Sequence, residues 1–122
     1  MKVDPAVPRK ILAGIRIVNG TAGLLAPQFL LRRLGTDPTR DRSGIYPFRM
    51  FGIRTILIGA DLLLLRGEQR RRAARFAVLI HASDTVAAVT AGLRGDVPRK
   101  AAAVTTLISG GNTALAILAT RE

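Results

Sequence analysis

The chain contains no cysteine and one histidine, and its acidic residues number only 8 against 19 basic ones. Without cysteine the protein can form neither a disulfide framework nor a thiolate metal site. No metal-ligand cluster extends beyond the single histidine and a nearby aspartate, and neither a Ser-His-Asp spacing signature nor a glycine-rich phosphate loop is present. We therefore expect a protein that is not an enzyme and that carries no cofactor or metal.

Aromatic residues are also scarce, at 4% of the chain. A nucleic-acid-binding protein would place arginine and lysine on helix faces or among stacking aromatic rings. Here the net charge of +11 coexists with 48% hydrophobic residues, which fall in four long blocks with basic residues in the gaps. The aromatic residues lie near the ends of these blocks, where an interfacial belt belongs. The pattern favours a membrane protein with no nucleic-acid partner, and a soluble helical bundle is the alternative.

The four blocks predict an all-α fold: a four-transmembrane-helix bundle of antiparallel up-down topology, in one domain over residues 1–122. We expect spans at about 11–31, 48–66, 73–93 and 101–120, each long enough for a bilayer core of about 30 Å. Pro27 predicts a kink in a first helix that ends at Gly35. The start superficially resembles a signal peptide, but Arg16 interrupts its apolar run, so we expect it to be retained.

The second block carries an arginine and an aspartate in its interior. Arg54 and Asp61 are seven residues apart, about two helical turns, so they project from nearly the same face of a helix. A charge in the middle of a bilayer costs roughly 2.5–3.5 kcal/mol on insertion scales. This helix therefore needs partner helices that place an opposite charge beside each of these two residues.

Depth along the helices predicts which charges meet. Arg16 and Asp61 both lie about 7–8 Å from the side of the membrane that holds the termini, and Arg54 and Asp84 lie about 9–14 Å from the other side. We expect two interhelical ion pairs, Arg16 with Asp61 and Arg54 with Asp84, mainly in a structural role. His81 shares a helix face with Asp84 and has no assigned partner, so a proton path through them is the functional alternative.

Two further features concern packing and the membrane rims. Asn112 lies among small residues of the fourth block and can hydrogen-bond across the bundle. The basic link from Gly67 to Arg72 must lie in water or among lipid phosphates, so we expect Arg70, Arg71 and Arg72 to contact anionic lipid headgroups.

The numbers of basic residues on the two sides of the membrane hardly favour one orientation over the other. The side with the termini carries Lys2, Arg9, Lys10, Arg66, Arg70, Arg71, Arg72, Arg75 and Arg121, and the other side carries Arg32, Arg33, Arg40, Arg42, Arg49, Arg94, Arg99 and Lys100. The cluster in the shortest loop favours cytoplasmic termini in the bacterial inner (plasma) membrane. A balance this close is also typical of a dual-topology homodimer.

Several short motifs resemble a family of small four-helix bacterial membrane proteins, of actinobacterial type and unknown function. They are a glycine-rich face with Arg16 in the first block, Phe51-Gly52-Ile53-Arg54 with Gly59 in the second, and Asp84 in the third. His81 departs from the family pattern, in which an apolar or acidic residue is expected. The resemblance implies the fold and a membrane location, and it implies no activity.

The sequence leaves several functions open. Our first hypothesis is a non-enzymatic accessory or stabilising subunit of a larger inner-membrane complex, with a lipid transporter as the best guess for that complex. Its partners would be other integral membrane subunits and anionic lipids. The alternative is a small homodimeric proton-coupled transporter gated by His81, Asp84 and Arg54. A membrane enzyme acting on lipid lacks any recognisable nucleophile or metal set.

Overall fold

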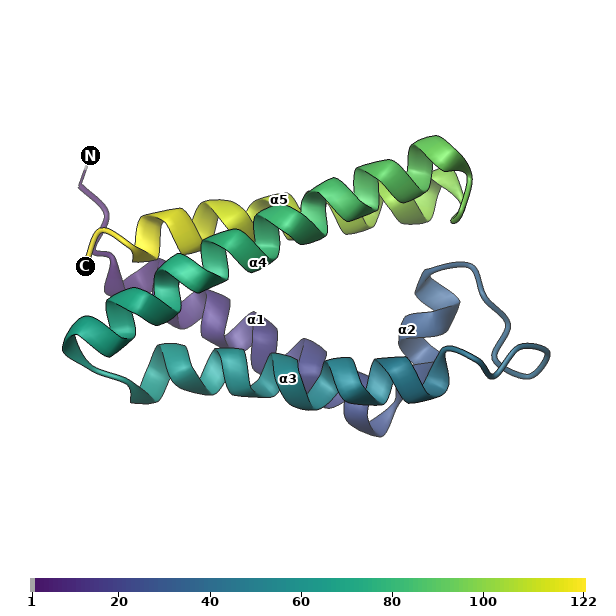
Figure 1. The fold of residues 1–122 in the computed structure, drawn as a ribbon, viewed down its shortest axis with the longest axis horizontal. Coiled ribbons are helices and arrows are strands. Elements are labelled where there is room, and N and C mark those ends of the chain that lie inside the picture. Colours follow the sequence, from purple (N-terminus) through teal and green to yellow (C-terminus); the bar gives the residue numbers. More distant parts are fainter. Residues whose placement is uncertain (1) are drawn as a thin grey trace.

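The computed structural model describes residues 2–122, and all regular secondary structure in that range is helical. The helices are α1 (Ala6–Leu25), α2 (Pro27–Arg33), α3 (Ile45–Leu64), α4 (Gly67–Arg94) and α5 (Arg99–Ala119). The four long helices α1, α3, α4 and α5 alternate in direction, so the two termini lie at the same end of the molecule (Figure 1). The predicted all-α class is confirmed.

The first helix is shorter than predicted because it breaks before Pro27. Ala26 has φ −139° and ψ 57°, outside the helical region, and Pro27 begins α2 as a separate helix of seven residues. Proline lacks a backbone N–H, and its ring disfavours helical geometry at the preceding residue. The expected span over 11–31 is therefore interrupted at residue 26. The predicted end at Gly35 is confirmed, with φ +82° there and the Thr36 amide donating to the Leu31 carbonyl at 3.0 Å.

Helix α4 is longer than predicted because the basic link 67–72 forms its first turns. Glutamate, glutamine and arginine are good helix formers, and Glu68 in the first turn suits the positive end of the helix dipole. The Glu68 carboxylate also pairs with Arg71 at 3.0 Å and with Arg75 at 3.5 Å. Local charge pairing thus continues the helix where we expected an irregular connection.

Of the four long helices, α4 and α5 are long and apolar enough to cross a membrane. Helices α1 and α3 fall short of the same criterion, and both carry charged side chains along their length, among them Arg16 in α1 and both Arg54 and Asp61 in α3. Composition and length therefore support two of the four predicted spans.

Helices α1 and α3 pack with their backbones almost in contact. A Cβ atom added to Gly20 would lie 2.6 Å from the Gly52 carbonyl oxygen, and one added to Gly52 would lie 2.5 Å from the Leu24 nitrogen. No larger residue fits at such distances without moving a helix. The glycine face predicted for the first block is thus the contact surface of the α1/α3 pair.

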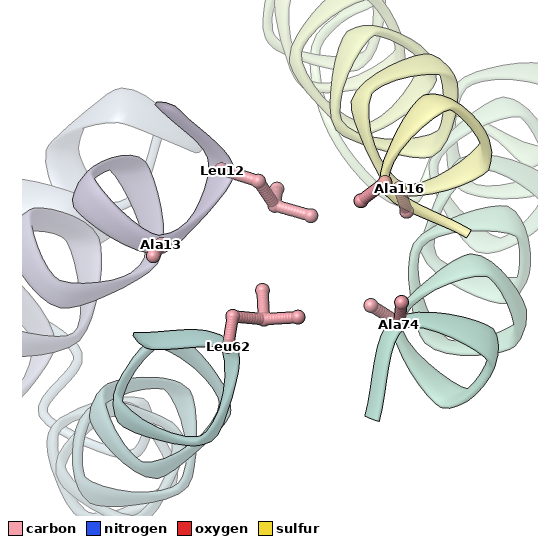
Figure 2. Packing of buried hydrophobic residues seen from close by; sticks show 7 residues of the cluster. Leu12, Ala13, Leu62, Ala74 and Ala116 are labelled. Atoms are coloured by element: carbon pink, nitrogen blue, oxygen red, sulfur yellow. The ribbon is translucent and has the colours of Figure 1, made fainter. Parts of the chain in front are cut away.

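At the end of the bundle that holds the termini, the four long helices converge on one apolar cluster. Leu12 and Leu62 are fully buried there and reach toward Ala116 and Ala74 on the opposite helix pair (Figure 2). We call this region the closed end; its buried residues are Leu12, Ala13, Leu62, Ala74, Ala77, Ala116 and Ala119. Two leucines between facing alanines fill the space between the α1/α3 and α4/α5 pairs.

Polar contacts also hold the closed end together. Arg9 is 5% exposed; its Nε donates to the Glu122 carboxylate at 2.8 Å and its Nη1 to the Leu62 carbonyl at 2.7 Å. Arg70 donates to the Leu65 carbonyl at 2.8 Å and lies 3.4 Å from Glu122. One carboxylate therefore ties the start of α1 to the start of α4.

Candidate functional site

Away from the closed end, the α1/α3 and α4/α5 pairs diverge toward the end that holds α2 (Figure 1). A cavity of about 370 Å³ lies between the pairs in this region, which we call the open end. Most of its walls are apolar, formed by leucine and phenylalanine side chains on one side and by alanines of α4 on the other. Its lining includes Leu30, Leu34, Phe48, Phe51, Ala87, Ala88, Ala91, Val97, Ala102 and Ile108.

Arg16 is the buried charge in this cavity. Its side chain lines the cavity together with Asn19, one turn further along α1, yet the residue is only 5% exposed. Among residues 2–122 its Nε has no hydrogen-bond partner, and none of the ion pairs includes its guanidinium. The Asp84 carboxylate in the same cavity attracts this cation without coming within ion-pair distance, so the guanidinium can still receive an anion.

Asp84 lines the same cavity from α4, with its side chain 48% exposed. Its carboxylate lies 3.7 Å from Nδ1 of His81, so the predicted proximity of these two residues is confirmed. The His81 imidazole is 0% exposed, and neither ring nitrogen has a hydrogen-bond partner in the described part of the chain. His81 is not among the cavity-lining residues, so of these two residues only Asp84 lines the cavity.

Both predicted ion pairs are wrong. Arg54 and Asp61 are exposed on the outer side of α3, and neither takes part in an ion pair within residues 2–122. The inward face of α3 is formed by Gly52, Thr55, Gly59 and Leu62. At 100° per residue, a side chain two positions after a glycine that faces inward points about 200° away from it. The predicted pairs follow from depth along each helix, whereas the rotation of each helix about its axis decides which side chains meet.

The other predicted polar contacts are met in part. Asn112 is buried at 3% exposure, but the side-chain hydrogen bonds of residues 2–122 include none from it. The contact between α4 and α5 is made instead by the Thr85 and Thr113 hydroxyls, 3.5 Å apart. In the basic cluster, Arg70 contributes to the closed end, whereas Arg71 and Arg72 are exposed. Contact of those two with lipid headgroups stays a prediction.

Two residues important at the closed end were missed in the sequence. Arg9 is one of the rim charges in the sequence and Glu122 belongs to no predicted contact, yet together they form the closest ion pair between distant parts of the chain. They are 113 positions apart, so no local pattern links them. The up-down topology was the one available signal, because it brings both termini to the same level of the bundle.

The arrangement at the open end is suited to binding a small molecule. Within residues 2–122, histidine and acidic side chains nowhere gather in groups of three that could hold a metal ion. The cavity combines long apolar walls with a small set of polar side chains, which are Arg16, Asn19, Arg33, Asp84, Thr105 and Ser109. Cavities of this size with few polar groups are typical of small-molecule sites, where the polar groups set the orientation of the ligand.

Comparison of the chain with protein families, with curated proteins and with solved structures finds no match. The resemblance to small four-helix bacterial membrane proteins therefore stays a prediction, carried by its short motifs alone.

Proposed function

We propose that this chain is a small integral protein of the bacterial inner membrane, whose four long helices all cross the bilayer. In this proposal it is a non-enzymatic accessory subunit of a lipid-handling complex, and its cavity holds the head of an anionic lipid. The observation that carries the proposal is Arg16, a residue 5% exposed overall and without an ion-pair partner in residues 2–122, whose side chain lines a largely apolar cavity.

The exposure of the apolar helices supports the membrane location. In α4 and in α5, only 17% of the most apolar window is buried inside the structure, whereas a core helix of a soluble protein would be mostly buried. The chain exposes 7750 Å² in total. A folded soluble monomer of 13.0 kDa exposes about 6,300 Å². An open bundle with this much apolar surface needs lipid or other protein around it.

The cavity supports an anionic amphiphile as the ligand. A phosphate or carboxylate accepts two parallel N–H bonds from a guanidinium, which supplies both affinity and orientation. An acyl chain would lie along the leucine, phenylalanine and alanine walls. Asp84 on the far wall would repel a second anion and so favours a ligand with a single anionic group near Arg16, or one that also carries an amine.

The first test measures lipid retention in mild detergent. Wild-type protein should keep a bound phosphatidylglycerol in native mass spectra, and Arg16→Gln should weaken its binding about tenfold or more, because a charge-assisted bond is replaced by a neutral one. Arg42→Gln, in the exposed loop before α3, is the matched control and should bind as wild type does. Equal retention by all three proteins would contradict the assignment of the cavity.

The second test addresses the accessory role. The tagged chain, extracted from its own membrane in mild detergent, should come out with larger membrane subunits, whose identities would name the complex. Recovery without any other subunit would contradict the accessory role while leaving the lipid site open to the first test.

The alternative of a proton-coupled transporter has less support. It requires His81, Asp84 and Arg54 around a water-accessible cavity, but the His81 imidazole is 0% exposed and Arg54 is on the outer side of α3. Only Asp84 of the three lines the cavity.

A further inference from the structure

The outer side of α3 carries a stripe of side chains that nothing in the bundle covers. Ile53, Leu57 and Leu64 are 47%, 57% and 75% exposed. Arg54 and Asp61 are exposed between them, on the same side of the helix. We call this stripe the α3 outer face; it comprises Met50, Ile53, Arg54, Leu57, Asp61 and Leu64.

Within residues 2–122, the two charges on this face form no ion pair with each other or with neighbouring side chains. Arg54 and Asp61 are two helical turns apart, about 10.5 Å along the axis, and neither forms an ion pair within residues 2–122. Arg72 lines the same shallow hollow as Asp61, but its guanidinium lies over the Phe76 ring, 5.4 Å from the centroid. In the bilayer that the proposed function assumes, both charges would face lipid, which is unfavourable.

We infer that a second copy of this chain covers the α3 outer face, with the two α3 helices antiparallel. A two-fold axis passing near Leu57 and Ile58 places Arg54 of one copy opposite Asp61 of the other, and the reverse pair forms by symmetry. The seven-residue spacing therefore places each charge of one copy beside the opposite charge of the other copy. A parallel arrangement would set Arg54 against Arg54 and Asp61 against Asp61 at the same depth, and like charges would repel.

Antiparallel helices in one bilayer require that the two copies insert in opposite orientations. The distribution of basic residues permits this, because the two ends of the bundle carry nearly equal numbers of lysine and arginine. The outer surfaces of α4 and α5 stay free for lipid or for other subunits. The inference rests on the membrane location in the proposed function, and it adds the partner and the geometry of contact.

The absence of cysteine allows a clean cross-linking test. In proteoliposomes under mild oxidation, a mixture of Met50→Cys and Leu64→Cys copies should form a mixed disulfide dimer, because the antiparallel axis brings these positions together. Neither variant should link to itself. Leu57→Cys, next to the axis, is the positive control. Self-linking of Met50→Cys would overturn the antiparallel arrangement, and failure of all three variants to link would overturn the dimer.

Charge variants test the ion pairs. Arg54→Asp and Asp61→Arg should each raise the dimer dissociation constant by at least about tenfold, because each places like charges in contact. The double variant Arg54→Asp with Asp61→Arg should restore it to within about threefold of wild type. Additive losses in the double variant would overturn the pairing.

Orientation provides the third readout. Arg42→Cys in the exposed loop should react with an impermeant maleimide in about half of the copies in sealed cells, and labelling of all copies or of none would overturn the opposite orientations. Removal of the chain from membranes by alkaline carbonate would overturn the proposed function as well. A membrane-bound monomer would overturn only the dimer.

Discussion

The closed and open ends of this bundle are built from the same four helices, yet one end is filled and the other is hollow. At the closed end, Leu12 and Leu62 project between alanines of α4 and α5 and are fully buried. At the open end, α4 again presents alanines, but the leucine and phenylalanine side chains opposite them leave a cavity of about 370 Å³. Side-chain size does not explain this difference, because the side chains at the open end are as large or larger; the divergence of the helix pairs leaves the space (Figure 1).

The two ends also differ in whether their buried arginine has hydrogen-bond and ion-pair partners. The buried arginine of the closed end, Arg9, has a carboxylate and a carbonyl as partners. The buried arginine of the open end, Arg16, has no ion-pair partner within residues 2–122. Two arginines of similar burial, seven positions apart on one helix, thus differ in whether the fold satisfies them. The satisfied one contributes to stability, and the unsatisfied one is the candidate for binding.

The largest effect should come from removing a leucine of the closed end. Leu62→Ala would leave a cavity among the four helices and should lower the free energy of unfolding by about 2–5 kcal/mol. Leu63→Ala is the matched control, since Leu63 is 41% exposed on the same helix and lies outside the α3 outer face. Thermal unfolding in mild detergent measures both. Equal losses in the two variants would mean that the closed end is not the stabilising core.

The next test adds volume at each end. Ala116→Leu would overpack the closed end, where Ala116 is 0% exposed, and should cost about 1–3 kcal/mol. Ala91→Leu would point into the existing cavity, so stability should be kept while lipid retention falls. Unfolding and native mass spectra of the two variants separate these outcomes, and destabilisation by Ala91→Leu as large as that by Ala116→Leu would contradict an open cavity.

A smaller effect is expected from the carboxylate that joins the termini. Glu122→Gln keeps the shape of the side chain but removes its charge beside Arg9 and Arg70, which should cost about 1.5 kcal/mol. The control is Glu68→Gln, whose pairs with Arg71 and Arg75 are exposed and should contribute at most about 1 kcal/mol. A larger loss in Glu68→Gln would reverse the ranking of these contacts.

The smallest effect concerns the loop beyond the open end. Side-chain and backbone hydrogen bonds from Thr39 lower the pKa of Asp37 below its ordinary value of 3.8, and those from Ser43 lower the pKa of Asp41 in the same way. A lowered folded-state pKa means that these turns add stability above pH 3.8 and lose it as the pH falls through the folded pKa.

Amide NMR shifts can follow this acid transition residue by residue. The Thr39 and Ser43 amides should titrate together with the aspartates they donate to, with midpoints below pH 3.8. Asp37→Asn should abolish the Thr39 transition and leave that of Ser43 in place. Midpoints at or above 3.8 would contradict the hydrogen-bonded turns.

The predictions made from sequence held where local chemistry decides. Gly35 ends its helix in the left-handed conformation, with φ of +82°. The glycine-rich face noted in the first block packs against the glycines of the second block, so α1 and α3 meet there. The length of α4 was underestimated because a run of arginines was interpreted as a loop, although Glu68 pairs with two of them and supports a helix.

The predictions failed where two distant segments had to be placed relative to each other. Arg16 was assigned to Asp61, but it lines a cavity with Asp84. Arg54 was assigned to Asp84, but it is exposed on α3. The depth of each charge follows from counting residues along a helix, whereas its direction depends on how each helix is rotated when it packs.

The sequence alone thus determined the all-α class, the interruption at Pro27 and the helix end at Gly35. These follow from hydrogen bonding and sterics within a few residues. Only the tertiary structure decided that Arg9 meets Glu122, that Arg16 lines a cavity with Asp84, and that Arg54 and Asp61 point outward. Those outcomes depend on helix rotation and on the volumes of side chains that meet across the bundle, which are set by packing over the whole chain.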